Sequence, residues 1–239
     1  MLSKNKIKLL TSLKQKKYRQ QHGLFVAEGI KTIQELLNSN LVLQQLYTRI
    51  TFNLDTSLET LITETDLKKI SFLKTPNQAL AVFKIPDAKP LPKTGLILVL
   101  DAVRDPGNLG TIIRLCDWFG IYNLVCSEQT VDCFNPKVIQ ATMGSITRVQ
   151  IHYTDLNDYL SSTSLPVYGA FMDGNTVYQE TLMQEGVLVM GNEANGISQA
   201  IEKLVTKRIS IPRFGSIQET ESLNVATATA ILLSEFKRR

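Results

Sequence analysis

The sequence predicts an α/β protein in which a mainly parallel sheet follows a smaller α/β unit. From Leu96 onward, short apolar runs alternate with helical segments, and this alternation is typical of a parallel sheet. The first run, Leu96–Leu100, is apolar throughout, as expected of a strand covered on both faces. Residues 85–95 contain three prolines, which favours a linker. The predicted organisation is a small α/β domain at 1–84, a linker at 85–95 and a second domain at 96–239.

The composition is that of a globular chain. Of 239 residues, 44% are hydrophobic and 20% are charged, and the net charge of +4 is weak evidence for a polyanionic partner. The three cysteines form no C-x-x-C pair, and their odd number argues against a disulfide framework. With only His22 and His152 beside them, no metal site is predicted. Reduced core cysteines indicate a cytoplasmic protein, and no apolar run approaches the roughly 20 residues of a membrane span.

The first 21 residues are predicted to form one basic amphipathic helix. Ile7, Leu10 and Leu13 make an apolar stripe at helical spacing, and no acidic residue precedes Glu28. Such a stretch is either a solvated helix face or a surface for RNA phosphates, because clustered lysines release counterions from nucleic acid. On the second interpretation, the phosphate-contacting candidates are Lys14, Lys16, Lys17 and Arg19.

The rest of the first domain alternates between strands and helices. Periodicity and β-branched runs predict strands at 24–27, 42–49 and 79–83. Helices are predicted at 29–38, 55–61 and 66–72.

The second domain is predicted to alternate in the same way. Strands are expected at 96–100, 122–126, 147–152, 166–171, 187–190 and 209–211. Helices are expected at 108–119, 136–143, 155–160, 198–204 and 222–236. Ligands of parallel sheets bind outside the carboxyl ends of the strands. The loops after Leu100, Phe171, Met190 and Ile211 are therefore expected to carry the chemistry.

The first polar cluster runs from Asp101 to Arg114. The sequence Asp-Pro-Gly-Asn predicts a turn that ends near Asn108, where a largely apolar helix starts. Arg114 lies between two apolar residues of that helix. It is either an ordinary exposed arginine or a functional one at the edge of the core, directed toward the strand ends.

The second cluster, Gly191–Ser198, directly follows an apolar strand. Two glycines bracket Glu193 in a loop between strand and helix, where glycine lets the backbone approach a ligand closely. The spacing is neither that of a dinucleotide fingerprint nor that of a P-loop, so both of those nucleotide sites are excluded. A plain turn is the alternative interpretation.

The third cluster lies between the last strand and the last helix. After Pro212 and a polar loop, Glu221-Ser222-Leu223-Asn224 precedes a helix rich in small residues. An ordinary helix cap is one interpretation. The other is a polar group presented where free backbone N–H groups also point outward.

In this order, the three clusters resemble the motifs of the SpoU/TrmH-type RNA ribose 2′-O-methyltransferases of the SPOUT superfamily. The matching stretches are Asn108-x-Gly110-Thr111-x-x-Arg114, Gly191-Asn192-Glu193-x-x-Gly196, and Ile209-Ser210-Ile211-Pro212 with Glu221-Ser222-Leu223-Asn224-Val225-Ala226. Met143-Gly144-Ser145 followed by Arg148 is a further similar feature, and Arg148 joins the RNA-contacting candidates. Phe25-Val26-Ala27-Glu28-Gly29 resembles the small substrate-binding domain of the family.

The resemblance implies a fold, a cofactor and an assembly. The second domain would carry a deep trefoil knot near its C-terminus, and S-adenosylmethionine would rest in that knot. Its candidate contacts are Met190, Gly191, Gly196, Ile211 and Leu223. The resemblance also implies a homodimer with the active site near the subunit interface.

The resemblance further implies methyl transfer to a ribose 2′-hydroxyl, which is a poor nucleophile. The hydroxyl must be aligned with the methyl group and must lose its proton as the new bond forms. Arg114 would approach the hydroxyl or the adjacent phosphate, as a base or as a positioning charge. An arginine accepts a proton only when strongly perturbed. The residues that would hold Arg114 and the ribose are Asn108, Glu193, Ser222 and Asn224.

The RNA target follows from analogy only. Ribosomal RNA is favoured over tRNA, and a catalytically silent RNA-binding or ribosome-assembly factor is the alternative of another class. One departure from the family pattern is the longer loop between Gly215 and Glu221, in which five residues intervene.

Overall fold

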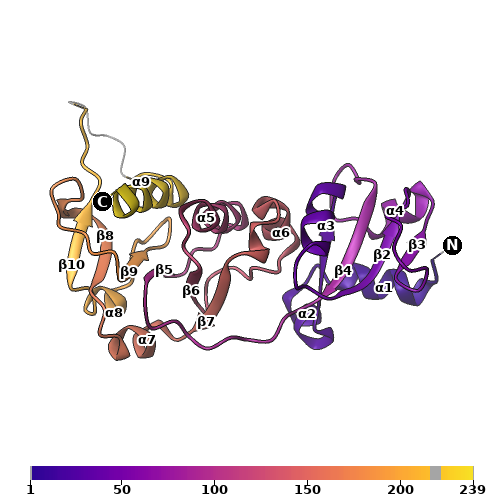
Figure 1. Cartoon of the computed structure of the whole chain (residues 1–239), viewed down its shortest axis with the longest axis horizontal. Helices are drawn as coiled ribbons and strands as arrows, with labels where there is room; N and C mark the ends of the chain where they lie inside the picture. Colours follow the sequence, from indigo (N-terminus) through magenta and orange to yellow (C-terminus); the bar gives the residue numbers. More distant parts are fainter. Residues whose placement is uncertain (1, 216–221, 239) are drawn as a thin grey trace. The chain divides into compact units, whose positions relative to one another are not determined.

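The computed structural model describes residues 2–215 and 222–238, and the chain divides into two compact units (Figure 1). Unit 1 comprises residues 1–87 and 132–147, and unit 2 comprises residues 88–131 and 148–239. The chain therefore passes from one unit to the other three times. The segment 132–147, which the sequence pattern assigned to the second domain, belongs to unit 1 because Phe134 and Ile139 join the apolar core of that unit.

Unit 1 contains a mixed sheet with the strand order β1-β4-β2-β3. Strand β4 runs antiparallel to β1 and β2, whereas β2 and β3 are parallel. The strands are β1 (Leu24–Glu28), β2 (Leu43–Thr48), β3 (Glu59–Leu61) and β4 (Ala79–Lys84). The helices are α1 (Lys4–Ser12), α2 (Lys16–His22), α3 (Ile30–Leu37), α4 (Glu64–Ile70) and α6 (Pro136–Thr142), with a 3₁₀ turn at Ser145–Thr147.

Helices cover both faces of this sheet because side chains of a strand alternate between faces. In β1, Phe25 and Ala27 pack with α3 and α6, whereas Val26 packs with α1 and α4. The lysine-rich helix α1 and helix α3 thus lie on opposite faces of the sheet (Figure 1).

Two predictions for this unit were wrong. Residues 1–21 form two helices, because the carbonyl groups of Leu13 and Lys14 turn inward and accept hydrogen bonds from Arg19 Nη1. The helix predicted at 55–61 is replaced by strand β3, which pairs with β2. The Glu59 carboxylate accepts the backbone N–H groups of Phe52 and Leu54, and these bonds hold an extended loop before β3.

Unit 2 contains a sheet with the strand order β10-β8-β9-β5-β6-β7, and every pairing in it is parallel. The predicted α/β fold with a mainly parallel sheet is therefore confirmed. The strands are β5 (Leu96–Leu100), β6 (Asn123–Ser127), β7 (Gln150–Thr154), β8 (Val167–Thr176), β9 (Gly186–Met190) and β10 (Lys207–Ser210). The helices are α5 (Pro106–Phe119), α7 (Leu156–Ser162), α8 (Gln199–Glu202) and α9 (Val225–Arg238).

The helices of unit 2 form two layers around the sheet. Ile97 and Val99 of β5 face the side covered by α7 and α8, and α9 packs against α5 on the other side (Figure 1). The chain moves outward from β5 to β6 and β7, then returns to β8 and β9. The loops after β5 and β9 therefore lie side by side where the strand order reverses, which is the usual ligand position in such sheets. Among the described residues, no helix is long and apolar enough to cross a membrane.

Candidate active site

A cavity of about 610 Å³ opens in unit 2 beside the middle of β8 and at the ends of β9 and β10. Its wall is formed by the loop after β9, the chain after β10 and the start of α9. All the residues proposed from sequence to contact a cofactor line it, namely Met190, Gly191, Gly196, Ile211 and Leu223. Two of the proposed catalytic residues, Glu193 and Ser222, line it as well.

The loop Gly191–Gly196 is closed tightly on itself. Asn192 and Gly196 exchange two backbone hydrogen bonds of 2.9 Å, and Gly196 has a φ of +67°. A methyl group added at Gly191 would come within 2.2 Å of the carbonyl carbon of Gly196. Glycine is therefore required at 191 for close approach of two backbone segments, and at 196 for its conformation.

Two side chains fasten this loop to the neighbouring one after β5. Asp101 is buried, and its Oδ2 accepts the backbone N–H of Ser198 at 2.8 Å. Asn192 Nδ2 donates to the carbonyl oxygen of Ala102 at 2.6 Å. The sequence did not single out Asp101 or Asn192 individually. The available signal was a polar residue placed directly after the apolar strand β5 and another directly after Gly191.

A chain of hydrogen bonds joins residues from all three motifs. Asn108 Nδ2 donates to Glu193 Oε1 at 2.8 Å, and Asn224 Nδ2 donates to Asn108 Oδ1 at 2.9 Å. These residues are 85 and 116 positions apart in the sequence. The fold thus brings Asn108, Glu193 and Asn224 together beside the cavity.

Local capping explains the position of the two asparagines. Asp105 caps α5 by accepting the backbone N–H of Asn108 at 2.8 Å, so the helix starts at Pro106 rather than at the predicted position 108. Asn224 accepts the backbone N–H groups of Ala226 and Thr227, which makes it the N-cap of α9. The last helix therefore begins at Val225, not at the predicted residue 222. Asn224 therefore fits both interpretations of this stretch: it caps a helix, and it also joins the row of hydrogen-bonded side chains with Asn108 and Glu193.

Arg114 is not brought to the cavity of its own chain. Arg114 lies six positions after Asn108 on α5. Around the helix axis, its Cα–Cβ bond therefore points about 120° from the direction of the Asn108 side chain. Its side chain is exposed, and it makes no hydrogen bond or ion pair with any residue that the structure describes. Glu221 and the five residues before it lie outside the described residues.

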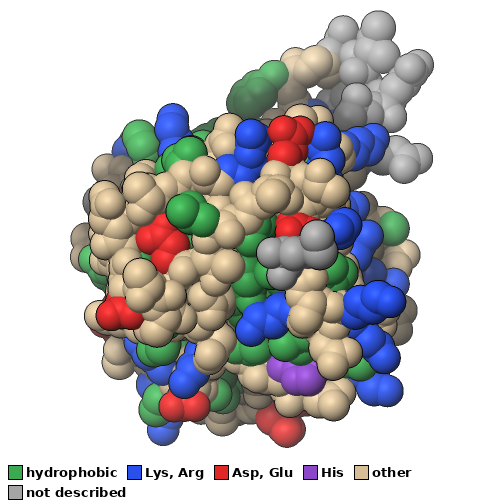
Figure 2. Space-filling view, turned by 90° about the vertical axis from the view of Figure 1, so that its right-hand side faces the viewer, with side chains coloured by type: hydrophobic (Ala, Val, Ile, Leu, Met, Phe, Trp, Pro, Cys, Tyr) green, Lys and Arg blue, Asp and Glu red, His purple; other side chains and the backbone are tan. Residues whose placement is uncertain are grey.

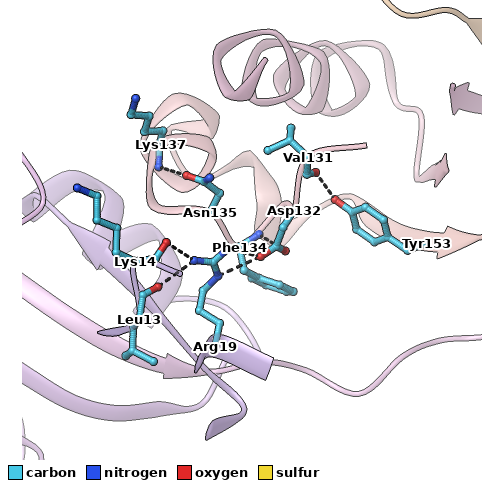
Figure 3. A network of polar contacts seen from close by, with 9 residues as sticks. All are labelled: Leu13, Lys14, Arg19, Val131, Asp132, Phe134, Asn135, Lys137 and Tyr153. Carbon is cyan, nitrogen blue, oxygen red and sulfur yellow. Dashed lines mark hydrogen bonds and ion pairs between the residues drawn. The ribbon is translucent and has the colours of Figure 1, made fainter. Parts of the chain in front are cut away.

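Arg19 is not an RNA-contacting residue, contrary to the prediction. Its side chain is only 2% exposed, and Nε donates to Asp132 Oδ2 at 3.0 Å (Figure 3). Its Nη1 donates to the carbonyl oxygens of Leu13 and Lys14. The guanidinium group is therefore occupied inside unit 1.

The other RNA-contacting candidates are exposed. Lys14, Lys16 and Lys17 lie on the surface of unit 1, and Lys and Arg side chains gather along one side of the face in Figure 2. Arg148, in unit 2, pairs with Asp117 through a bond of 2.9 Å from Nε to Oδ2. Its charge is thus partly engaged within the chain.

The three cysteines are buried thiols rather than disulfides. Burial raises the pKa of the Cys116 thiol, which keeps that side chain in its neutral, unreactive form. None of the three cysteines lines the cavity.

Comparison with known proteins identifies the family. Residues 95–234 match the model of the SpoU rRNA Methylase family. The chain belongs to this family. Residues 4–81 match a second model, that of the MRM3-like substrate binding domain.

Relatives of this SpoU-family chain match it over nearly its whole length. The chain is 32% identical to the 23S rRNA (guanosine(2553)-2′-O)-methyltransferase RlmP of Bacillus subtilis, over 95% of this chain and 94% of that protein. Among solved structures, an RNA methyltransferase of the TrmH family from Porphyromonas gingivalis is 40% identical with a TM-score of 0.91, covering 100% and 99% of the two chains. An AdoMet-bound rRNA methyltransferase from Sinorhizobium meliloti is 26% identical with a TM-score of 0.88, covering 100% and 97%.

Proposed function

We propose that this chain transfers a methyl group from S-adenosylmethionine to a ribose 2′-hydroxyl of ribosomal RNA. The observation that carries the proposal is the hydrogen-bonded chain Glu193–Asn108–Asn224 at the edge of the cavity. The names of the relatives support the reaction and the RNA class, since RlmP of Bacillus subtilis is a 23S rRNA 2′-O-methyltransferase. A tRNA target is the second candidate.

The cavity suits the proposed cofactor. Its volume of about 610 Å³ falls within the range of roughly 300–1,000 Å³ that is typical of small-ligand pockets. Ile211 and Leu223 offer apolar surface to an adenine ring, and the glycines at 191 and 196 expose backbone groups. When bound, S-adenosylmethionine supplies an electrophilic methyl group on a sulfonium sulfur. The related protein from Sinorhizobium meliloti was crystallised with this cofactor.

The hydrogen-bonded side chains of Glu193, Asn108 and Asn224 are suited to holding the ribose. Glu193 keeps free lone pairs on its carboxylate and can accept a hydrogen bond from a sugar hydroxyl. Asn108 fixes the carboxylate from one side, and Asn192 Nδ2 lies 3.4 Å from the other oxygen. An aligned hydroxyl reacts faster because the orientation has been fixed before the reaction. Binding through a ribose hydroxyl also selects RNA over DNA.

We also propose a homodimer in which α5 lies near the interface, so that Arg114 of each subunit reaches the cavity of the other and positions the reacting groups there. Arg114 is exposed on α5, and Trp118, four positions later on the same side of the helix, is 84% exposed. Tryptophan is enriched at protein–protein interfaces, so an exposed Trp118 is consistent with a contact between subunits. Membership of the SpoU family also supports a trefoil knot near the C-terminal end of the second domain. We further propose a cytoplasmic location, which the bacterial rRNA methyltransferase RlmP among the relatives supports.

The role of Arg114 is tested by replacing it with alanine. We expect Arg114→Ala to lower the rate of methyl transfer to ribosomal RNA by about 100-fold or more, because a charge that positions the reacting groups is lost. Calorimetry with S-adenosylmethionine should show unchanged cofactor affinity. The matched control is Lys203→Ala, an exposed cation outside the cavity, which should retain full activity. A fully active Arg114→Ala protein would refute the assigned role.

A silent RNA-binding factor is the remaining alternative. It would bind RNA but would release no heat with S-adenosylmethionine. The presence of Asn108, Glu193 and Asn224 in one bonded chain favours the enzyme.

A further inference from the structure

A second pocket lies in unit 1, built from residues of that unit alone. It has a volume of about 450 Å³ and lies between helix α3 and the loop after β2. Gln34 contributes from the helix, Asn38 from its C-terminal cap, and Phe52 and Asn53 from the loop. Nothing in the proposed methyl-transfer chemistry uses these residues.

The loop that forms one wall is held in place from beneath. Phe52 and Leu54 donate their backbone N–H groups to the two carboxylate oxygens of Glu59, at 2.8 and 3.0 Å. Thr48 Oγ1 donates to the carbonyl oxygen of Ile50 at 2.7 Å. Asn53 has a φ of +59°, a conformation that asparagine tolerates better than most residues. The loop is thus fixed before any ligand arrives, which lowers the entropic cost of binding.

The lining offers flat apolar surface and neutral polar groups. The ring of Phe52 is partly buried against the core and lines the pocket. Three carboxamides, from Gln34, Asn38 and Asn53, each present donors and an acceptor. No residue that lines the pocket carries a charge. These properties suit a neutral planar ligand with donors and acceptors on its edge.

A cation lies beside the pocket. Lys31 is exposed on α3. It lies three positions before Gln34, so the two side chains are neighbours on the helix surface. It makes no ion pair with any described residue. A phosphate attached to the bound ligand would therefore find a counter-charge at the rim.

We propose that this pocket binds one unpaired base of the RNA substrate, with Lys31 contacting the adjoining phosphate. Proteins read single-stranded RNA by stacking bases on aromatic rings and bonding their edges through side chains. The match of residues 4–81 to a substrate binding domain is consistent with this role. The inference rests on the proposed function only in taking RNA as the substrate. A peptide is the competing occupant.

The test measures binding of short single-stranded RNA to the full chain. The probes are fluorescent RNA pentamers of A, C or U, with a perfectly paired RNA duplex as the probe that has no free base. Phe52→Leu keeps apolar packing but removes the ring, and Asn38→Ala removes one amide. The matched control is Asn40→Ala, an exposed amide two residues from Asn38 and outside the pocket.

We expect Phe52→Leu and Asn38→Ala each to weaken binding of at least one pentamer by about fivefold or more, because stacking and edge contacts are lost. Asn40→Ala and duplex binding should change by less than about twofold. Gln34→Ala, at an exposed position, supplies a further variant if Phe52→Leu is unstable. Unchanged binding of every pentamer to the stable pocket variants would overturn the proposal, and a peptide occupant would give this result.

The two proposals fail separately. If the protein methylates ribosomal RNA but its pocket variants bind pentamers normally, only the base-binding proposal is refuted. If it binds pentamers through Phe52 and Asn38 but transfers no methyl group, only the enzymatic proposal is refuted.

Discussion

Asn108 links the three motifs through both ends of one amide group. Its nitrogen donates to Glu193 and its oxygen accepts from Asn224, so neither aspartate nor alanine reproduces its bonding. Its backbone N–H donates to Asp105 Oδ1, which fixes the start of the helix that carries the side chain. We infer that Asn108 orients Glu193 rather than reacting itself.

Replacing Asn108 should reduce turnover with little effect on cofactor affinity. We expect Asn108→Ala to lower kcat by about 10–100-fold, because Glu193 and Asn224 both lose a fixed partner. Asn108→Asp should be at least as impaired, since an oxygen would then face the Glu193 carboxylate. Steady-state kinetics separate kcat from KM, and calorimetry measures S-adenosylmethionine binding.

The control for Asn108 is Asn195→Ala, in the same loop as Glu193 but outside the cavity lining. It should behave as the unchanged protein. Equal losses in both variants would indicate general damage to the loop and would contradict a specific role for Asn108.

The positions of site residues were predictable from the sequence where a motif contained them. They were not predictable where a residue's bonding partner is distant in the sequence. The motifs supplied Asn108, Glu193 and Asn224, and the structure places them together. In the sequence, Arg19 was interpreted as one more exposed cation of a basic helix. Its partner Asp132 lies 113 positions away in the sequence, and no local sequence pattern predicts an ion pair between such distant residues.

At the scale of elements, the Arg19 network ties the turn between α1 and α2 to the segment that precedes α6. The guanidinium bonds two carbonyl groups on the helix side and Asp132 on the other (Figure 3). Asp132 Oδ1 in turn accepts the backbone N–H of Phe134, whose ring packs against Phe25 of β1. This buried ion pair therefore helps to position the segment 132–147 within unit 1.

Removing Arg19 should destabilise the protein without a selective effect on RNA affinity. We expect Arg19→Ala to cost about 3 kcal/mol of unfolding free energy, because Asp132 is left without its buried partner. The thermal midpoint should then fall by roughly 6–12 °C. Calorimetric melting of Arg19→Ala beside Lys17→Ala, an exposed neighbour, measures the difference. A normal midpoint with weakened RNA binding in Arg19→Ala would restore the phosphate-contacting role.

Most elements followed from apolar patterning, and the exceptions have local physical causes. Strands β5, β6 and β9 of unit 2 are buried, mainly apolar runs, so their existence was evident from the sequence. Strand β3 was mistaken for a helix because three residues carry little periodicity. Its strand character comes from pairing with β2 and from the Glu59 contacts, both of which are tertiary.

At the scale of the whole molecule, strand order decides where the chemistry lies. The alternation of strands and helices predicted a parallel sheet, but alternation alone does not give the order of its strands. The reversal between β5 and β9 places the loops after both strands together, and the chain after β10 completes the cavity. The three crossings between the units were also beyond local pattern, since they depend on which core takes up Phe134 and Ile139.

The most direct measurement is a map of ribose methylation in total RNA from cells with and without the gene. We expect one 2′-O-methyl group to disappear from ribosomal RNA in the deletion strain. The native gene should restore this methyl group, whereas the Arg114→Ala gene should not. An unchanged ribosomal RNA map, or loss of a methyl group from tRNA alone, would contradict it.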